Sequence, residues 1–268
     1  MTQESPAAVS LYQEPDQGLS LDSTFNFHCH AGLACFNRCC QAPTIILSPY
    51  DLLRLQDCLG IGSGEFLERY TLRHPEESSN LPLVFLDAFS SPGGCPFLGE
   101  EGCRVYFHRP AACRLFPITM GSQLTEQGVV DYYFCRKLDY CQGFDTDGQW
   151  TVESWKANQG FADYEQERRE WFEIFLNKGL EGPLDSDPRV QDLFVTIAYD
   201  LDGWRGLLSD PAFLQAAGLE GDPAAYLQMT DLELLQLSYR YLQAVLFSED
   251  GGLPPVVERM ANKARQDD

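Results

Sequence analysis

Ten cysteines are the residues of this 268-residue chain whose type and spacing could do chemistry, and all of them lie between Cys29 and Cys141. Four fall within the short stretch CHAGLACFNRCC, which ends in the adjacent pair Cys39 and Cys40. The others are Cys58, Cys95, Cys103, Cys113, Cys135 and Cys141. Thiolates bind zinc and iron–sulfur clusters well. This density therefore indicates a metal centre rather than a set of small buried hydrophobic side chains.

The spacing of the thiols is not the usual spacing of zinc ligands. No two cysteines are separated by two residues, as they are in zinc knuckles and ribbons. Adjacent side chains in an extended chain point to opposite faces, so Cys39 and Cys40 are not expected to bind one ion easily. They would bind two different metals, or two irons of one larger cluster. These two observations favour an iron–sulfur cluster, with zinc as the alternative.

The formal net charge of −21 argues against a nucleic-acid partner and against an anionic membrane surface. No stretch has the 18 apolar residues of a membrane span, and the first residues lack the basic and apolar regions of a secretory signal. We therefore expect a cytoplasmic protein, whose partner or substrate, if it has one, is a protein. Disulfides are rare in that compartment, so metal ligation is the first explanation for the thiols.

Several elements must position these thiols. The stretch SPYDLLRLQDCLG predicts a helix with Ser48 as its N-cap, Pro49 in its first turn and Gly60 as its terminator. Cys58 lies in this helix among leucines and is expected in the core. A second helix is predicted over residues 63–74, and strands are predicted over 81–89 and 129–135.

The residues that follow Cys141 contain no cysteine and have helical patterns. Helices are predicted over 151–179, 190–210 and 230–250, the last with a capping box formed by Thr230 and Glu233. Residues 142–150 are rich in Gly and Asp and are predicted to be a linker. The expected fold is α+β, with an irregular, metal-organised cysteine-rich module followed by a mostly helical part. The predicted boundaries are 1–24 for an N-terminal tail, 25–145 for the module and 146–268 for the helical part.

The stretch CPFLGEEGCRVYFHRPAACRLFP, which begins at Cys95, resembles the signature of the YkgJ-like cysteine-cluster family, a zinc- or iron-chelating domain. The first cysteine cluster, LSPYDLLRL, CPFL, a Cys before a Tyr and RPAACRLFP occur in the family's order over roughly residues 25–141. The first cluster departs from the family pattern, because its loops are wider. The resemblance implies metal binding and no known reaction.

One branch of that family is similar to flagellin lysine N-methylases, which are thought to hold an iron–sulfur cluster. This similarity leaves a metal-containing enzyme, such as a methyltransferase acting on protein lysines, as an alternative function. The sequence contains no Gly-rich strand-to-helix fingerprint for a cofactor. A structural zinc protein is a further alternative.

We predict eight metal ligands, with Cys141 as the substitute if Cys29 or Cys135 is not used. The eight are Cys29, Cys35, Cys39, Cys40, Cys95, Cys103, Cys113 and Cys135. Arg109 and Arg114 are predicted to lie beside the thiolates, because a partly buried negative centre needs nearby donors. The predicted function is binding of an iron–sulfur centre with a redox or maturation role.

Overall fold

The structure is a computed structural model that describes residues 18–41, 43–91, 93–181, 183–248, 253 and 255–258. Its strands are β1 (Thr24–Asn26), β2 (Ile46–Leu47), β3 (Thr71–Pro75), β4 (Pro82–Leu86), β5 (Leu98–Gly99), β6 (Gly102–Cys103), β7 (Ile118–Thr125), β8 (Gly128–Cys135) and β9 (Gln149–Thr151). They form small antiparallel sheets in the orders β1–β9, β2–β4–β3, β5–β6 and β7–β8.

The α-helices lie mostly in the second half of the chain. They are α1 (Pro49–Leu59), α2 (Ser63–Tyr70), α3 (Ala111–Leu115), α4 (Val152–Asn158), α5 (Ala162–Glu181), α6 (Pro188–Ala198), α7 (Leu201–Leu208), α8 (Pro211–Ala217), α9 (Pro223–Leu227) and α10 (Asp231–Leu246). Short 3-10 turns are η1 (Arg38–Cys40), η2 (Tyr106–His108) and η3 (Gln142–Asp145). The predicted α+β class is confirmed. No described helix is long and apolar enough to cross a membrane.

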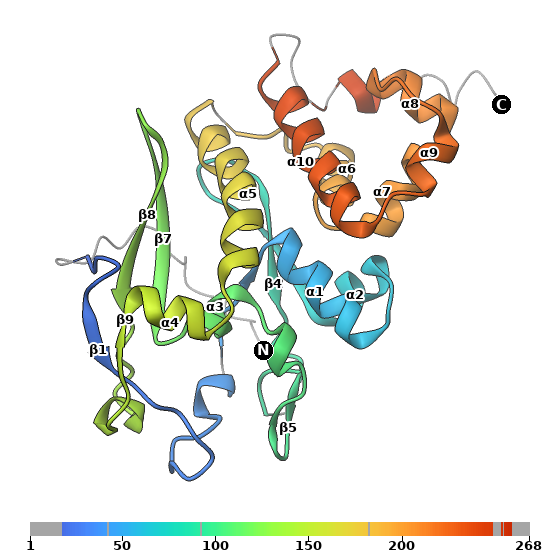
Figure 1. Cartoon of the computed structure of the whole chain (residues 1–268). Helices are drawn as coiled ribbons and strands as arrows, with labels where there is room; N and C mark the ends of the chain where they lie inside the picture. Colours follow the sequence, from blue (N-terminus) through green and yellow to red (C-terminus); the bar gives the residue numbers. More distant parts are fainter. Residues whose placement is uncertain are drawn as a thin grey trace, which may run out of the picture.

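Figure 1 shows how these elements are arranged. The long β7–β8 hairpin and the β1–β9 pair lie on one side of α5, and α1 and the C-terminal helices α6 to α10 lie on the other side. The β5–β6 hairpin and the loop after β1 are at the lower end of the view. The cysteine segments are therefore gathered at the end of the molecule farthest from α8 and α10.

The predicted start and end of the first helix are confirmed. The Ser48 hydroxyl accepts a hydrogen bond from the Asp51 backbone N–H at 3.1 Å, and the Asp51 carboxylate accepts one from the Ser48 N–H at 2.8 Å. Together they form a capping box at the N-terminus of α1. Gly60 ends the helix in the left-handed conformation, with φ 65°, which a glycine adopts without steric cost.

The sequence predicts Cys58 in the core, but in the structure this residue is exposed. The buried face of α1 is centred on Leu52 and Leu55, which have no exposed surface. At 3.6 residues per turn, Cys58 lies about 120° round the helix from Leu52. Its leucine neighbours in sequence therefore point elsewhere, and its thiol faces solvent.

The predicted helix over 63–74 is a helix only as far as Tyr70. Thr71 is extended and begins β3, where it pairs with Leu86 of β4, and its hydroxyl donates to the Leu67 carbonyl at 2.6 Å. The β-branched threonine suits the extended chain, so the helix becomes a strand at this residue. The strands predicted over 81–89 and 129–135 are confirmed as β4 and β8.

Residues 142–150, predicted to be a linker, are instead part of the folded module. Strand β9 pairs with β1, and the N–H groups of Phe27 and His28 donate to the carbonyls of Gly148 at 2.6 Å and Gly143 at 2.9 Å. Of the predicted tail, residues 1–17 lie outside the described residues. Leu19 donates to the Tyr133 carbonyl at 2.6 Å and so lies against β8.

The helical part has more and shorter helices than predicted. The pattern over 151–179 forms α4 and α5, which are separated near Gly160, a residue with φ 59°. The pattern over 190–210 forms α6 and α7, because the Asp200 carboxylate accepts from the Gly203 N–H and starts a new helix. The capping box of Thr230 and Glu233 at the start of α10 is confirmed.

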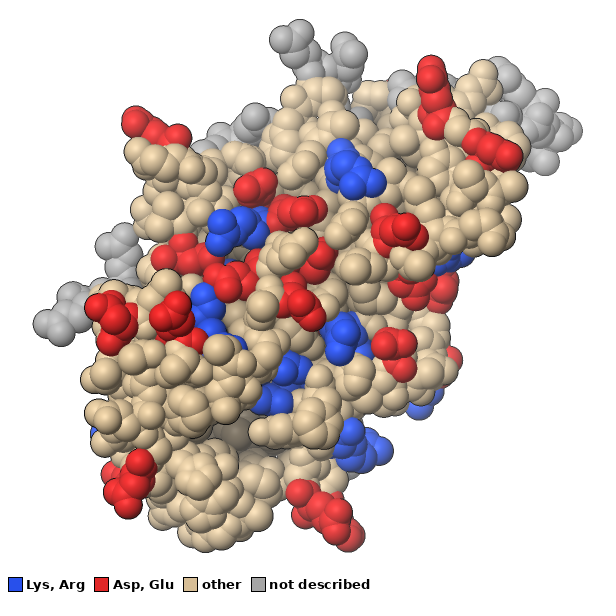
Figure 2. All heavy atoms as spheres, in the orientation of Figure 1, with Lys and Arg blue, Asp and Glu red and all other residues tan. Residues whose placement is uncertain are grey.

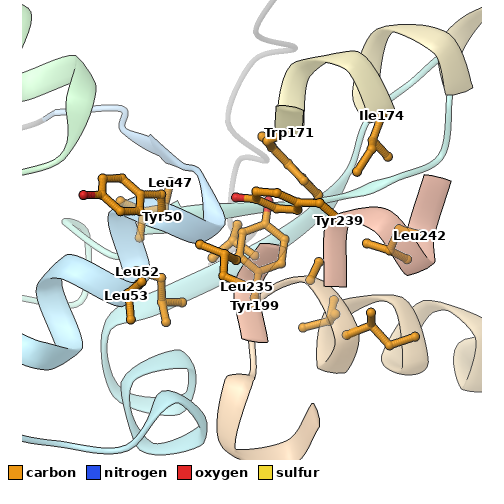
Figure 3. Close-up of a cluster of buried hydrophobic side chains, with 14 of the residues drawn as sticks. Leu47, Tyr50, Leu52, Leu53, Trp171, Ile174, Tyr199, Leu235, Tyr239 and Leu242 are labelled. Carbon is orange, nitrogen blue, oxygen red and sulfur yellow. The ribbon is translucent and has the colours of Figure 1, made fainter. Parts of the chain in front are cut away.

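The two predicted parts share one hydrophobic core. Figure 3 shows Tyr50 and Leu52 of α1 near Trp171 of α5 and Tyr239 of α10. The Trp171 ring centroid lies 5.4 Å from that of Tyr199 and 6.0 Å from that of Tyr239. All five side chains belong to one cluster of buried residues. Helix α1, which begins with the SPYD motif, is therefore packed against helices that follow the last cysteine.

A second link joins α2 to α7 through Ser63, which has no exposed surface. Its backbone N–H donates to the Asp202 carboxylate at 2.8 Å, and its hydroxyl donates to the Asp200 carboxylate at 2.5 Å. The Asp202 N–H in turn donates to the Ser63 hydroxyl at 2.9 Å. Side chains from each helix start thus satisfy N–H groups of the other, which helices otherwise leave without partners.

We predict that Ser63→Ala lowers the free energy of unfolding by about 1–3 kcal/mol, because it removes a hydrogen bond to the Asp200 carboxylate and leaves the Asp202 N–H without its partner. Urea unfolding followed by far-ultraviolet circular dichroism measures the change. Ser248→Ala is the control, since that exposed hydroxyl donates to the Val245 carbonyl three residues before it, within its own chain segment. Equal stability of the Ser63 variant and the control would contradict the role of this link.

Candidate metal centre

The cysteines fall into three segments: the first covers residues 29–40, the second 95–103 and the third 135–141. The first segment is held at its start by Phe27, which is buried and packs edge-on against Phe116, Phe144 and Trp155. The segment then runs through turns to Asn37, whose left-handed φ of 67° precedes the turn η1. This turn places the Cys39 and Cys40 sulfurs 3.9 Å apart. Cys39 is exposed and Cys40 is half-buried. The adjacent thiols are therefore in contact, at the edge of the protein surface.

Cys40 lies against the second cysteine segment. Its carbonyl accepts a hydrogen bond from the Cys95 N–H at 2.8 Å. Gly94 has φ 104°, and a Cβ atom there would lie 2.5 Å from the Cys40 carbonyl oxygen, so this approach requires glycine. The Leu98 N–H donates to the Cys95 carbonyl at 3.0 Å, and Leu98 pairs with Cys103 across the β5–β6 hairpin. Cys95 and Cys103 are thus brought together beside Cys40.

Cys113 is positioned by a buried carboxylate of α1. Asp51 is 2% exposed, and besides its capping box it accepts a hydrogen bond from the Ala111 N–H at 2.7 Å. Ala111 begins α3, which carries Cys113 in its middle. One side chain therefore joins the SPYD motif to the RPAACR motif, two motifs far apart in the sequence.

Cys35 lies against the third cysteine segment. Its sulfur accepts a hydrogen bond from the Gln142 N–H at 3.2 Å, which places it beside Cys141. Cys135 is the last residue of β8, opposite Ile118 of β7. The Arg38 guanidinium lies 4.4 Å from the centre of the Tyr140 ring, which joins the same segment to η1. The segment from 135 to 142 thus approaches the side of the first segment that carries Cys35 and Arg38.

Charge interactions also connect the thiols. The pKa of Cys29 is raised to about 11, first by burial and then by the thiolates of Cys39, Cys141 and Cys35. The pKa of Cys40 is raised, first by its hydrogen bond with Cys39, whereas the same hydrogen bond lowers the pKa of Cys39 to about 7. Within this pair, Cys39 is therefore the thiol with the lower pKa.

The remaining half-buried thiols have raised pKa values for the same main reason. Burial is the largest cause for each of them, namely Cys95, Cys103, Cys113, Cys135 and Cys141. Neighbouring thiols raise these pKa values further, as Cys95 does at Cys113 and Cys35 does at Cys141. All eight predicted ligands, together with Cys141, thus lie within one electrostatic neighbourhood.

The donor set fits a centre of soft metals, because free thiols are the ligands that zinc and iron–sulfur clusters prefer. Within the described ranges, no three His, Cys, Asp or Glu side chains stand close enough together to hold an ion. Binding would therefore have to draw the thiols inward from their present positions. Such coupling between metal binding and local folding is common in small metal domains.

The two predicted arginines hold the loop before Cys113. Arg109 donates to the Tyr106 carbonyl at 2.5 Å, and Arg114 donates to the Phe107 carbonyl at 2.5 Å and to the Gln159 carbonyl at 2.6 Å. The positive charge of Arg109 lowers the pKa of Cys103, partly offsetting the effect of burial. Arg109 thus acts on a thiol through its charge, whereas the described contacts of Arg114 are with backbone carbonyls and the Tyr164 ring.

Sequence reasoning missed the role of Asp51 in positioning Cys113 and the contact between Cys35 and residue 142. The signal for Asp51 was its place in the SPYD motif, which was interpreted only as a helix start. The sequence also gave no indication that Cys58 lies near the second cysteine segment, where its charge raises the pKa of Cys103.

Figure 2 shows few charged side chains and a hollow in the surface toward the lower end of the molecule, where Figure 1 places β5. Residues 28–142 match the model of the CxxCxxCC family, described as "Putative zinc- or iron-chelating domain". The resemblance found in the sequence is therefore confirmed for these residues, which make up less than half of the chain. No curated protein and no solved structure gave a significant match.

We predict that Asp51→Ala lowers both the stability of the protein and its metal content. Loss of the buried acceptor removes the capping box and frees the Ala111 N–H, at a cost of about 1–3 kcal/mol. Because α3 is then held less firmly, Cys113 binds metal less well. Urea unfolding and metal analysis measure the two effects. Asp57→Ala, an exposed change in the same helix, is the control. An Asp51 variant with normal stability and metal content would show that this contact is dispensable.

A second expectation concerns protons. Thiols with raised pKa values, such as Cys29 at about 11, are protonated near neutral pH, so a metal ion must displace their protons. Adding Zn²⁺ to metal-free protein in weak buffer should therefore release protons, and the apparent affinity for zinc should fall as the pH is lowered. An indicator dye and a competing chelator measure these quantities between about pH 6 and about pH 8. Ser248→Ala, the exposed change already used as a control, should behave like the wild type. An affinity that does not change with pH would contradict thiol ligation.

Proposed function

We propose that the thiols of the 28–142 domain hold an iron–sulfur centre with a redox or maturation role in the cytoplasm. The observation that carries metal binding is the gathering of thiols from distant chain segments around the Cys39–Cys40 pair, whose 3.9 Å separation is compatible with either metal. The proposed ligands are those predicted from the sequence, namely Cys29, Cys35, Cys39, Cys40, Cys95, Cys103, Cys113 and Cys135, with Cys141 as the substitute if Cys29 or Cys135 is not used.

The choice of iron–sulfur over zinc is supported by the spacing of the ligands. Structural zinc sites usually take two of their ligands from a short knuckle, and no such pair occurs in this chain. Iron–sulfur clusters take thiolates from more varied spacings. A family described as chelating zinc or iron is compatible with both metals.

An iron–sulfur centre, when bound, would supply exchange of single electrons. The protein's own residues would then set its surroundings. Asp51 holds the helix of Cys113, and the charge of Arg109 stabilises the thiolate of Cys103. Tyr106 and Phe107 are 52% and 79% exposed at η2, between these thiols, and their carbonyls are held by Arg109 and Arg114. We propose that a protein partner contacts this fixed aromatic pair.

Protein purified without air should contain iron and acid-labile sulfide and should absorb broadly in the visible range, because iron–sulfur clusters have charge-transfer bands there. Metal analysis, sulfide analysis and an absorption spectrum check this. Brief exposure to air, which should bleach the spectrum, serves as the internal control. A colourless protein with stoichiometric zinc would overturn the iron assignment and leave metal binding in place.

A further inference from the structure

We propose that the thiols form two separate four-thiolate metal sites, which divide between Cys39 and Cys40. Site 1 consists of Cys29, Cys35, Cys39 and Cys141, and site 2 consists of Cys40, Cys95, Cys103 and Cys113. Cys135 is a ligand of neither site. This inference depends on the proposed metal binding, but it does not depend on whether the metal is zinc or iron.

The members of site 1 are joined by contacts between the first and third cysteine segments. The Gln142 N–H donates to the Cys35 sulfur at 3.2 Å, so Cys35 and Cys141 are neighbours. The Arg38 guanidinium lies 4.4 Å from the centre of the Tyr140 ring, which brings the residue before Cys39 to the residue before Cys141. Cys29 joins them because the N–H of His28, the residue before it, donates to the Gly143 carbonyl at 2.9 Å, close to Cys141.

The members of site 2 are joined by contacts between η1, the β5–β6 hairpin and α3. Cys40 accepts from the Cys95 N–H at 2.8 Å, and the close approach of Gly94 fixes this crossing. Leu98 contacts both Cys95 and Cys103 through backbone hydrogen bonding and strand pairing. The neighbouring charges that raise the pKa of Cys113 are, in decreasing order, those of Cys95, Cys103, Asp51 and Cys39.

The distance between the adjacent sulfurs does not by itself separate the two sites. Two thiolates of one tetrahedral zinc, at Zn–S of about 2.3 Å, lie about 3.8 Å apart, which is close to the 3.9 Å between Cys39 and Cys40. Their partners are what differ. Cys40 is tied by its own carbonyl to Cys95, whereas Cys39 follows Arg38 toward residues 140–142. The Cys39 charge also acts on Cys103 and Cys113, so the division between the two sites rests on these backbone and ring contacts.

Cys135 is set apart from both groups by its position. It is the last residue of β8, paired with Ile118 of β7, and the Arg136 N–H that follows donates to the Pro117 carbonyl at 2.8 Å. The thiol charge that acts on it is that of Cys141, and it also lies near Lys137. It is therefore a neighbour of one ligand of site 1 rather than a member of the group.

The test compares metal per chain in single and double serine variants. Metal-free protein is loaded with Zn²⁺ alone and, in a separate anaerobic series, with ferrous iron and sulfide. Cys39→Ser and Cys141→Ser should each lose about half of the bound metal, and the double variant of these two should lose no more than either single variant. Cys40→Ser and Cys113→Ser should lose the other half. The double variant Cys39→Ser/Cys40→Ser should lose nearly all of it. Cys135→Ser and the control Cys58→Ser should keep all of it.

Several results would overturn the division into two sites. If Cys39→Ser and Cys40→Ser each abolish all metal binding, the pair serves one shared centre. If Cys135→Ser loses as much metal as Cys141→Ser, the assignment of the third segment is wrong. Circular dichroism of each metal-free variant detects misfolding. Misfolding would also not reproduce the expected pattern, in which two substitutions in one site together lose half of the metal and two substitutions in different sites together lose nearly all of it. Two zinc ions per wild-type chain without iron would refute the proposed iron centre alone, whereas no metal in either series would refute both.

Discussion

The buried carboxylate of Asp51 is the contact on which the arrangement of the cysteine segments depends. It starts α1, whose leucines belong to the common core, and it also receives the first N–H of α3, which carries Cys113. Burial raises the pKa of this carboxyl, and hydrogen bonds from the Ala111 and Ser48 backbones lower it again. A charge removed from water is tolerated only with such partners. The thiols are thus connected to a rigid helix rather than held by their loops alone.

Much of the local structure follows from short-range chemistry, and those parts could be predicted. Ser48 and Gly60 bound α1 as their side chains and backbone preferences require, and Thr230 starts α10 for the same reason. Predictions were wrong where a contact distant in sequence decides the outcome. The helix ends at Tyr70 because Thr71 finds a strand partner in Leu86. Residues 149–151 are a strand because β1 lies beside them.

In the metal site, too, the features that depend on local sequence could be predicted and those that depend on contacts distant in sequence could not. The cysteine pattern and the motifs around it identify the family and the class of ligand, because they depend on residue types in a given order. Which thiol faces which depends on crossings such as that of Gly94 over Cys40, and no spacing rule contains that information. Cys58 illustrates the limit, since its helix was predicted correctly but its face was not. A rotation of about 120° round a helix moves a side chain from the core to the solvent without changing the pattern around it.

The reciprocal cap between Ser63 and the two aspartates at the start of α7 has a consequence for the order in which the protein is made. Asp200 and Asp202 follow the last cysteine, Cys141, by a stretch that a ribosome needs about 3–12 s to translate. During that interval all ten of these thiols have been synthesised, while the start of α2 still lacks its cap and α1 still lacks its partner α10. The nascent chain thus carries these thiols before all the helices that fix their surroundings exist. Protection of these thiols from oxidation or from the wrong metal during synthesis must therefore come from outside the chain.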